Sequence, residues 1–322
     1  MKSAFRSKYG SAAVLSIKEI ETPIPKDNEV LIRVYAATVN RSDCHILTGR
    51  PFIMRLFLGL FKPASPVTGT DFAGEIAATG KNTSSFKTGD KVMGFSGGLF
   101  PIGSHAQYIL LPETKAIKII VPVPDSIGYE EAAACLEGAF YAAGICRLYP
   151  KAGQKALVYG ATGAIGSAYV QFLKYYGVYI TAVCRGEHRE LMQSLGADKV
   201  IDYTREDFTK DTERYDFVLD AVGRTSFFRC KILLKKHGMF ASSGGAENLL
   251  LLLIRPLTGS KKVVFKSPKS IREGLLFITS LIEKGCFRPV IDRKYPLDKI
   301  ADAFDYVASG QKLGNVIINM DA

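Results

Sequence analysis

Residues 155–185, KALVYGATGAIGSAYVQFLKYYGVYITAVCR, decide the fold class of this chain. The stretch begins with a short apolar run, Ala156 to Tyr159, of the kind that forms a buried parallel strand. Apolar residues then recur at helical spacing until Gly177, and a second apolar run extends from Val178 to Cys184. This order predicts a strand, a glycine loop, a helix and a second strand, which together form half of a nucleotide-binding unit.

Gly160, Gly163 and Gly166 stand three residues apart where the predicted strand meets the helix. Missing side chains there allow a tight turn, close approach of the backbone to a pyrophosphate, and close packing of helix on strand. The helix start adds free N–H groups and the positive end of its dipole. An isolated glycine pattern also occurs in ordinary turns, but here the flanking strands and helix favour a dinucleotide site. The predicted contacts in this loop are Gly160, Thr162, Gly163, Ala164, Ile165 and Gly166.

The residue that ends the second strand indicates which dinucleotide binds. A carboxylate there would hold the ribose 2′-hydroxyl of NAD, whereas a cation accommodates the 2′-phosphate of NADP. Arg185 occupies this position, and His188 and Arg189 follow it closely. One charge-assisted contact contributes about 1.5 to 3 kcal/mol, or roughly tenfold to hundredfold in affinity. We therefore predict NADPH over NADH; the alternative is that Arg185 is a solvated surface side chain.

Composition narrows the class of protein. A chain of 322 residues with 47% hydrophobic content can form two globular domains with their own cores. Its six cysteines lack paired spacing and no signal peptide precedes Gly10, so we expect a reducing cytoplasm and no disulfides. The net charge of +11 is spread along the chain, which favours a basic enzyme that attracts a phosphorylated cofactor over a specific nucleic-acid binder.

The region before the proline-rich boundary at Pro122 to Asp125 is rich in β-strand patterns. In Glu29 to Ala37, apolar residues alternate with others, which indicates one core-facing side of a partly closed barrel. The predicted strands are Val14–Ile20, Glu29–Ala37, Phe72–Ala78, Lys91–Phe95 and Ala106–Leu111.

After that boundary, strand and helix patterns alternate, which predicts a doubly wound parallel sheet with ligands at the carboxyl ends of its strands. Tyr203, Gly223 and Gly244 follow such strands and are further cofactor candidates. Beyond the glycine loop, the predicted elements are the helix Glu187–Leu195, the strands Lys199–Asp202 and Tyr215–Asp220, the helix Ser226–Lys236 and the strand Met239–Ser243.

Nearly the whole chain resembles the medium-chain dehydrogenases and reductases, and within them the zinc-free quinone oxidoreductase branch. The motifs that carry this resemblance are VNRSDCHILTG (39–49), TGTDFAGEI (68–76), FKTGDKVMG (86–94), GSHAQYILLP (103–112), YGATGAIGSAYVQ (159–171), LGADKVIDY (195–203), DAVG (220–223) and LGNVII (313–318). One departure is at Gly314 and Asn315, where relatives usually carry a lysine after the glycine.

The resemblance implies an α/β protein with two domains. A GroES-like β-barrel substrate domain would comprise residues 1–124 and be completed by 270–322, and a Rossmann NADP-binding domain would comprise residues 125–269. Members of this branch are commonly homodimers joined by extension of the Rossmann sheet, and Lys261–Lys266 is the strand expected at that edge.

The same fold hosts zinc alcohol dehydrogenases, whose catalytic metal needs three protein ligands. At the positions of their ligands this chain resembles the zinc-free branch, because it carries Asn40 and the pair Thr70 and Asp71. Cys135 falls near the third ligand, but one cysteine cannot build the site and equally suits a buried packing position. We therefore expect no metal.

Without a metal, reduction must rely on a hydride from NADPH and on hydrogen bonds to the developing oxyanion. Asn40 is the first catalytic candidate, since its amide could donate to the substrate oxygen or fix the nicotinamide ribose; alternatively it caps a turn. Asp43 is expected to brace this loop rather than act as a base. His45 stands where the bacterial quinone reductases often have a tyrosine, and could donate a proton or be a structural loop histidine. His105 is expected to be structural.

The resulting hypothesis is an NADPH-dependent, zinc-free reductase of small hydrophobic quinones or α,β-unsaturated carbonyls. The alternatives are a zinc-independent NAD(P)-dependent alcohol or carbonyl dehydrogenase and a non-catalytic NADPH-binding protein. Two apolar stretches, Phe52–Phe61 and Leu249–Leu257, could wall a substrate channel, cover a dimer surface, or make a peripheral membrane contact.

Overall fold

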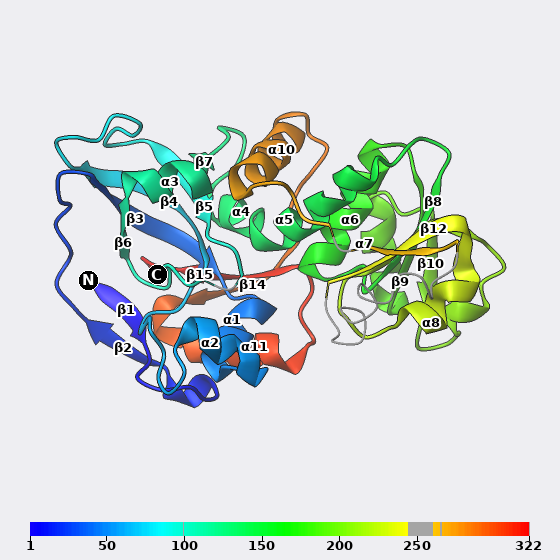
Figure 1. Ribbon diagram of the computed structural model, residues 1–322, viewed down its shortest axis with the longest axis horizontal. Helices are drawn as coiled ribbons and strands as arrows, with labels where there is room; N and C mark the ends of the chain where they lie inside the picture. The colour runs from blue at the N-terminus through cyan, green and yellow to red at the C-terminus, as the bar shows by residue number, and fades with distance from the viewer. Residues whose placement is uncertain (99, 244–259, 265, 322) are drawn as a thin grey trace. The chain divides into compact units, whose positions relative to one another are not determined.

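The computed structural model describes residues 1–322 except 99, 244–259, 265 and 322. It contains two compact units (Figure 1). The first unit comprises Met1–Glu137, Lys269–Glu283 and Arg288–Ala322, and the second comprises Gly138–Pro268 and Lys284–Phe287. The first unit therefore continues to Glu137, beyond the boundary expected at residue 124, and the chain returns to it near its end.

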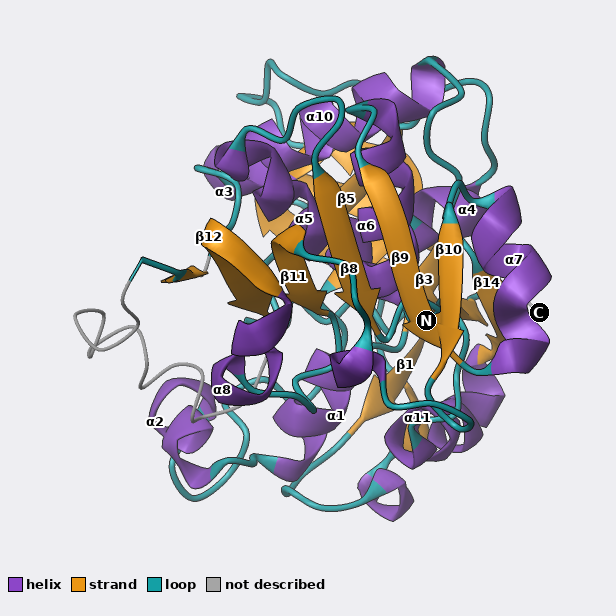
Figure 2. Cartoon of the chain, turned by 90° about the vertical axis from the view of Figure 1, so that its right-hand side faces the viewer, coloured by secondary structure: helices purple, strands orange, loops and turns teal. Residues whose placement is uncertain are grey.

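The second unit is built on a six-stranded sheet in the order β10-β9-β8-β11-β12-β13. All its pairings are parallel (Figure 2). This is the doubly wound order, in which the chain changes direction between its first and fourth strands and ligands bind at that point. Its strands are β8 (Lys155–Tyr159), β9 (Tyr179–Cys184), β10 (Lys199–Asp202), β11 (Tyr215–Asp220), β12 (Leu234–Ser242) and β13 (Lys262–Val264).

Helix α6 (Ala164–Tyr175) follows β8, and α7 (Arg189–Ser194) follows β9. A core beneath this sheet includes Leu157, Val218 and Phe240, which are fully buried. The expected short strands have two apolar faces because helices cover both sides of a parallel sheet.

The helix expected over Ser226–Lys236 is wrong in its second half. Helix α8 ends at Cys230 (Phe227–Cys230), a 3-10 turn follows to Leu233, and β12 begins at Leu234. Leu234 pairs with Tyr215 of β11 and is 2% exposed. Strand pairing and burial at Leu234 therefore override the helical spacing, and Gly238 lies inside the strand instead of ending a helix.

The first unit contains a mixed sheet in the order β14-β15-β3-β4-β5-β7, with β6 paired to β3. The strands β1 and β2 form a separate pair. Strand β5 has the predicted bounds, whereas β2 and β6 begin two residues later than predicted. The strands are β1 (Lys2–Phe5), β2 (Ser16–Glu19), β3 (Glu29–Thr38), β4 (Asp71–Thr79), β5 (Lys91–Phe95), β6 (Tyr108–Pro112), β7 (Ile120–Pro122), β14 (Ile291–Pro296) and β15 (Asn315–Asn319).

Helices pack around this sheet and cover a core to which Val30, Ile32 and Val34 of β3 contribute, as their alternation predicts. The helices of the first unit are α1 (Arg41–Thr48), α2 (Arg55–Leu58), α3 (Glu113–Ile119), α4 (Tyr129–Ala134), α10 (Ile271–Glu283) and α11 (Ile300–Ser309). Helix α5 (Glu137–Ala143) has its first residue, Glu137, in the first unit and the rest in the second.

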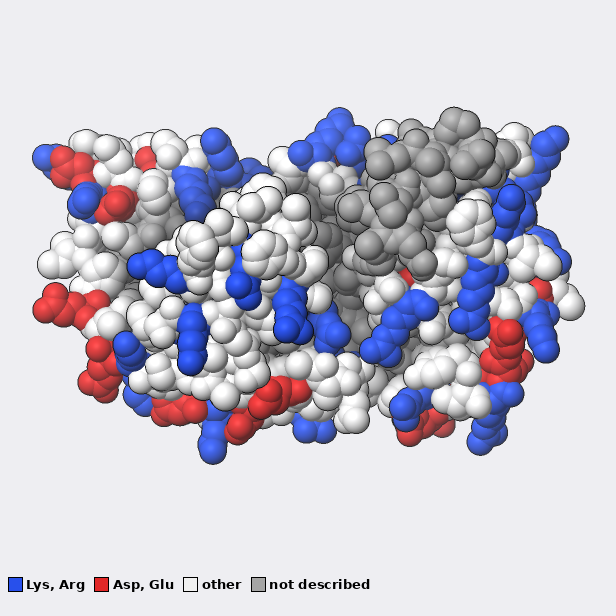
Figure 3. All heavy atoms as spheres, turned by 60° about the horizontal axis from the view of Figure 1, so that its bottom comes forward, with Lys and Arg blue, Asp and Glu red and all other residues white. Residues whose placement is uncertain are grey.

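Basic side chains are distributed over the surface in keeping with the net charge of +11 (Figure 3). All six cysteines are free thiols. Among the described residues, no helix is both long enough and apolar enough to cross a bilayer.

Candidate functional site

The glycine loop of the second unit joins β8 to α6, as predicted. Gly160 has a φ of 75°, a left-handed conformation that favours glycine. A Cβ at Gly166 would lie 2.2 Å from the carbonyl oxygen of Gly160, so only glycine lets the helix approach the strand this closely. A Cβ at Gly163 would meet nothing closer than 3.6 Å, so this glycine is not required by contacts within the protein. It lies at the N-cap of α6, where the backbone N–H groups point out of the helix.

Arg185 directly follows β9, and its guanidinium Nε donates to the hydroxyl of Tyr203 over 3.3 Å. The arginine side chain is 61% exposed and only loosely paired with Glu187, at 3.9 Å. The Tyr203 hydroxyl is the main cause of the raised pKa of Arg185. The two residues come from adjacent strand ends, since Cys184 of β9 pairs with Asp202 of β10. An exposed cation and an aromatic hydroxyl are thus held together beside the strand ends.

Asp202 is a carboxylate near Arg185 that the sequence interpretation did not use. It accepts hydrogen bonds from the backbone N–H and the hydroxyl of Thr204, at 2.9 and 2.7 Å. These bonds lower the pKa of Asp202 and engage its carboxylate with Thr204, in the turn that follows β10. A cavity of about 470 Å³ lies in the same region, and its lining includes Tyr159, Tyr203 and Arg229.

The other predicted cofactor residues differ in how they are held. Arg189 donates to the carbonyl of Val200 over 3.2 Å, which ties its guanidinium to β10. His188 lies 3.4 Å from Glu187 and is half-buried. Thr162, Ala164 and Ile165 are half-buried in the loop and first turn of α6. Gly244 lies outside the described residues, as does the apolar stretch 249–257.

The turn after β11 is held by Asp220, which the sequence interpretation did not single out. Its carboxylate accepts from the backbone N–H groups of Val222, Gly223 and Thr225 at 2.8 to 3.0 Å. Gly223 has a φ of 67°, so this turn needs its glycine. The carboxylate of Asp220 therefore fixes the position of Gly223, a predicted cofactor contact.

In the first unit, Asn40 stands between β3 and α1 and is 4% exposed. Its amide nitrogen donates to the hydroxyl of Thr38 at 2.6 Å and to the carboxylate of Asp71 at 3.1 Å. Both amide hydrogens are therefore directed at protein acceptors. The Asn40 side chain also accepts from the backbone N–H of Asp43 in a capping box, so Asn40 caps α1, as the alternative interpretation expected. A second lone pair of the amide oxygen is left for an external donor such as a ribose hydroxyl.

Asp71 also accepts from the backbone N–H and the hydroxyl of Thr38, at 2.9 and 2.5 Å. Burial, with a contribution from Glu137, raises the pKa of Asp71 to about 8. His105 bonds the carbonyl of Thr38 through Nε2 at 2.9 Å and the hydroxyl of Thr68 through Nδ1 at 2.8 Å. Burial lowers the pKa of His105 to about 4, so the ring is neutral, and both of its nitrogens hold the end of β3 in place.

Asp43 and His45 lie on α1, one turn beyond Asn40. The buried carboxylate of Asp43 accepts from the backbone N–H of Asn40 at 2.8 Å, which braces the loop. His45 is on the exposed side of the helix, and partial burial together with the charge of Arg41 lowers its pKa. The catalytic roles of Asn40, Asp43 and His45 stay predictions.

Glu137 is a further residue that the sequence interpretation missed. Its side chain is 6% exposed and accepts from the hydroxyl of Ser42 at 2.5 Å and from the hydroxyl of Thr70 at 3.2 Å. Burial raises the pKa of Glu137. The ammonium group of Lys312 is also part of this electrostatic cluster: burial lowers its pKa to about 8, while Glu137 acts in the opposite direction. A carboxyl group with a raised pKa thus bonds Ser42, two residues beyond Asn40.

A catalytic zinc does not fit these side chains. The polar groups of Thr70, Asp71 and Asn40, which the resemblance places at the ligand positions, bond one another or their neighbours. Cys135 is fully buried, and burial holds its pKa well above the ordinary value, so the thiolate that a metal requires is disfavoured. Among the described residues, no group of three or more His, Cys, Asp or Glu side chains is arranged to hold a metal ion.

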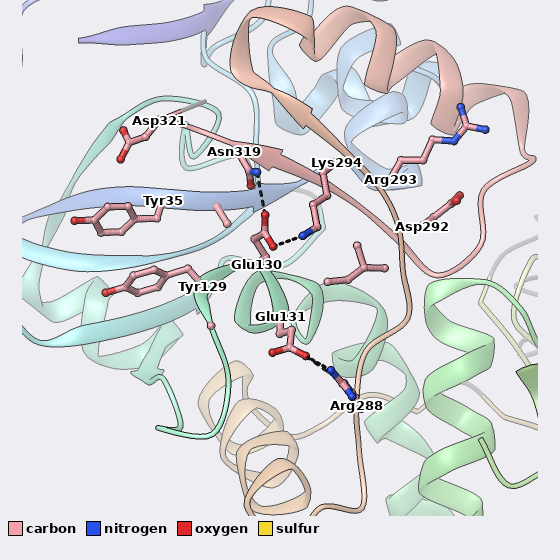
Figure 4. Close-up of a pocket in the computed structure, with 13 residues that line it drawn as sticks. Tyr35, Tyr129, Glu130, Glu131, Arg288, Asp292, Arg293, Lys294, Asn319 and Asp321 are labelled. Carbon is pink, nitrogen blue, oxygen red and sulfur yellow. Dashed lines mark hydrogen bonds and ion pairs between the residues drawn. The ribbon is translucent and has the colours of Figure 1, made fainter. Parts of the chain in front are cut away.

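A separate cavity of about 830 Å³ opens on the first unit (Figure 4). Tyr35 and Tyr129 stack there with ring centroids 4.6 Å apart. Glu130 pairs with Lys294 at 2.5 Å, and Glu131 pairs with Arg288 at 3.2 Å. These ion pairs link α4 to the returning C-terminal segment, so we regard this cavity as structural.

Comparisons with known proteins agree with this description. Residues 26–125 match the alcohol dehydrogenase GroES-like domain, and residues 195–318 match the family described as zinc-binding dehydrogenase. A chloroplast envelope quinone oxidoreductase homolog from Arabidopsis thaliana is 31% identical, covering 98% of this chain and 96% of that protein. An NADPH-dependent alkenal/one oxidoreductase of the same plant is 31% identical over 99% of this chain and 79% of that protein. The solved quinone oxidoreductase of Coxiella burnetii superposes with a TM-score of 0.85 at 23% identity, covering 99% of both chains.

The chain belongs to the medium-chain dehydrogenase/reductase superfamily, in its quinone oxidoreductase-like branch. The expected architecture, a Rossmann sheet with a GroES-like domain, is confirmed. Membership makes the chain an oxidoreductase with a nicotinamide cofactor. The binding role of the loop around Gly160 stays a prediction.

Proposed function

We propose that the protein is an NADPH-dependent reductase of quinones or α,β-unsaturated carbonyls that works without a metal. The observation that carries this proposal is the pair of half-buried Ser42 and buried Glu137, which we propose as the proton-supplying group. The names of the similar proteins, a quinone oxidoreductase homolog and an alkenal/one oxidoreductase, support the same acceptor class.

The preference for NADPH rests on Arg185. A phosphate on the adenosine ribose would find an exposed guanidinium there, with the Tyr203 hydroxyl beside it. The nearby carboxylate of Asp202 is already bonded to Thr204, so it competes weakly for a ribose hydroxyl. The NADPH dependence named for one Arabidopsis relative supports this assignment.

The proposed reaction needs one hydride and one proton. Bound NADPH supplies the hydride, which adds to the β-carbon of an enone with its electron pair. The charge then spreads into an enolate, so less electrostatic stabilisation is needed than for a localised alkoxide. In this scheme the protonated form of Glu137 would donate to the oxygen of Ser42, which reverses the hydrogen bond seen between them, and the Ser42 hydroxyl would turn to the enolate. The Ser42 proton would move to the α-carbon of the enolate while the Glu137 proton moves to Ser42. Glu137 is left as a carboxylate and recovers its proton from water.

Asn40 and Asp43 take positioning roles in this scheme. Asp43 holds the start of α1 through the backbone of Asn40, and the amide of Asn40 orients Thr38 and Asp71. The amide oxygen of Asn40 would accept from a ribose hydroxyl of the cofactor. His45 is the alternative proton donor, and its exposure on α1 leaves it accessible to solvent.

The proposal extends to assembly and compartment. Strand β13 lies at one end of the described Rossmann sheet, so its free edge is the surface that we propose for a homodimer. The six free thiols suit a reducing compartment, and we propose the cytoplasm.

An acceptor screen tests the function. Purified protein would be assayed with NADPH and NADH against quinones, alkenals and simple ketones, each with and without a chelator. The proposal expects NADPH oxidation with the conjugated acceptors and rates that the chelator leaves unchanged. Faster turnover of simple alcohols and ketones would favour a zinc-independent alcohol dehydrogenase instead.

A further inference from the structure

An exposed apolar projection follows α1 in the first unit. This apolar segment, residues 52–61, comprises a 3-10 turn and α2. Large apolar side chains recur at positions 52, 53, 56 and 57, the spacing of one helix face, and Leu60 and Phe61 follow the end of α2. Their exposed fractions are 64% for Phe52, 61% for Ile53, 62% for Leu56, 64% for Phe57, 42% for Leu60 and 91% for Phe61. A contiguous patch of this kind on a water-facing surface marks an interaction site.

The segment is fixed from behind by contacts within the first unit. Leu58 is 4% exposed and anchors α2 in the protein. The hydroxyl of Tyr9 donates to the carbonyl of Gly59 at 2.6 Å, and the guanidinium of Arg55 lies 4.5 Å from the centre of the Tyr9 ring. The apolar side chains are therefore held outward by a packed base, which lowers the entropy cost of presenting them to a partner.

Along the chain, the charges next to this segment are of one sign. Between Asp43 and Asp71 the chain contains no acidic residue, whereas Arg50, Arg55 and Lys62 flank or lie within the apolar segment. Figure 3 brings forward the lower side of Figure 1, where α2 is labelled. In the left half of Figure 3, basic side chains lie among uncharged surface, and acidic side chains lie mainly toward the left and lower edges. An occupant of this surface must therefore offer both an apolar medium and negative charge.

We propose that residues 52–61 dock the protein on the surface of an anionic phospholipid bilayer. The aromatic and aliphatic side chains would enter the boundary between headgroups and acyl chains, and Arg50 and Lys62 would contact lipid phosphates. The segment is too short to span the bilayer, so the contact is peripheral. A second copy of this surface would place like charges opposite one another, which disfavours a symmetric dimer here. The proposal does not depend on which acceptor the enzyme reduces.

Vesicle flotation of the full chain tests this docking. The probes are vesicles of phosphatidylcholine alone and vesicles in which part of the phosphatidylcholine is replaced by phosphatidylglycerol. We expect binding to the anionic vesicles, weaker binding to the neutral ones, and loss of the difference at high salt. The Phe57→Ser, Phe61→Ser double variant should reduce the partition coefficient by about tenfold or more. The Arg50→Gln, Lys62→Gln variant should reduce it by about tenfold on anionic vesicles only.

The matched control is Phe228→Ser, Ile232→Ser in the second unit, where the two side chains are similarly exposed, at 64% and 60%. This variant should bind vesicles like the parent protein, and the melting temperature of each variant checks that it folds. Three results would each overturn the proposal: no binding to anionic vesicles, equal loss in the control, or binding that the Phe57 and Phe61 changes leave intact. A mass that falls from dimer to monomer in the Phe57→Ser, Phe61→Ser variant would assign the surface to a second copy and also overturn it.

Discussion

The hydroxyl of Ser42 donates a hydrogen bond of 2.5 Å to the carboxylate of Glu137, although 95 positions separate the two residues along the chain. Ser42 belongs to α1 and Glu137 begins α5, so the contact depends on the fold of the whole first unit. Burial raises the pKa of Glu137, which keeps a proton on this carboxyl at a higher pH than usual. This pair is the proton relay that we propose for the reduction.

Replacing Glu137 by Gln should remove the titratable proton while retaining shape and hydrogen bonding. General acid catalysis contributes about 10² to 10⁴ in rate, so enone turnover should fall in that range while the affinity for NADPH is kept. Quinone reduction should fall less, because quinol oxygens take protons from water readily. The measurement is the initial rate across a pH series. The fall in rate at high pH that we expect of the parent protein should be absent in the variant.

Two variants separate this route from its alternatives. Glu131→Gln removes a carboxylate that pairs with the exposed Arg288, and it should leave the rates unchanged. His45→Phe should also retain enone turnover if Glu137 is the donor. A large loss in His45→Phe with full activity in Glu137→Gln would assign the proton to the histidine.

Arg185→Ala should weaken NADPH binding by roughly tenfold to hundredfold and leave NADH binding nearly unchanged, because one charge-assisted phosphate contact is lost. Calorimetric titration of each nucleotide measures both. Arg214→Ala serves as the control, since Arg214 precedes β11 at the end opposite the cofactor edge and donates to backbone carbonyls. Equal affinities of the parent protein for the two nucleotides would contradict the assignment.

The glycine loop allows stability and cofactor binding to be separated. Gly166→Ala would place a Cβ 2.2 Å from the carbonyl oxygen of Gly160, so it should destabilise the fold by about 1 to 3 kcal/mol and also impair NADPH binding. Gly163→Ala meets nothing closer than 3.6 Å and should leave stability nearly intact while weakening NADPH binding. Denaturant unfolding with nucleotide titration measures both quantities; a stable Gly166→Ala variant would refute the proposed close packing.

His105 should make the protein less stable in acid. Its pKa is lowered to about 4 in the folded state, from an ordinary value of 6.5, so the unfolded chain binds the proton more readily. The stability contributed by the neutral ring is fully present above pH 6.5 and is lost as the pH falls toward 4, by roughly 3 kcal/mol in total. The free energy of unfolding, measured against pH, should have a smaller slope in His105→Gln than in the parent. His237→Asn, which changes an exposed histidine, should keep the parental slope.

Much of the second unit could be predicted from the sequence because its signals are local. The bounds of β10 and β11 and the glycine loop follow from short apolar runs and glycine spacing. The helix expected to reach Lys236 was wrong because Leu234 pairs with Tyr215 in the sheet. The spacing of residues along one segment does not reveal such a contact between strands.

The candidate site of the first unit was only partly predictable. Asn40 and Asp43 lie in one short motif, so their proximity could be expected. Glu137 meets Ser42 and Thr70 only through the fold, and its position at the start of α5 carries no local signal of a role. Lys312 also carries no local signal of a role: it precedes Gly314, and its charge comes under the influence of Glu137 only through the fold.

The most direct test of the account is the rate of NADPH oxidation by metal-depleted protein with a conjugated acceptor and with its saturated analogue, for example an enone and the corresponding ketone. We predict rapid oxidation with the enone, little with the ketone, and no change on adding zinc. Activity that required added zinc, or that favoured the saturated ketone, would contradict the proposed metal-free reduction of conjugated acceptors.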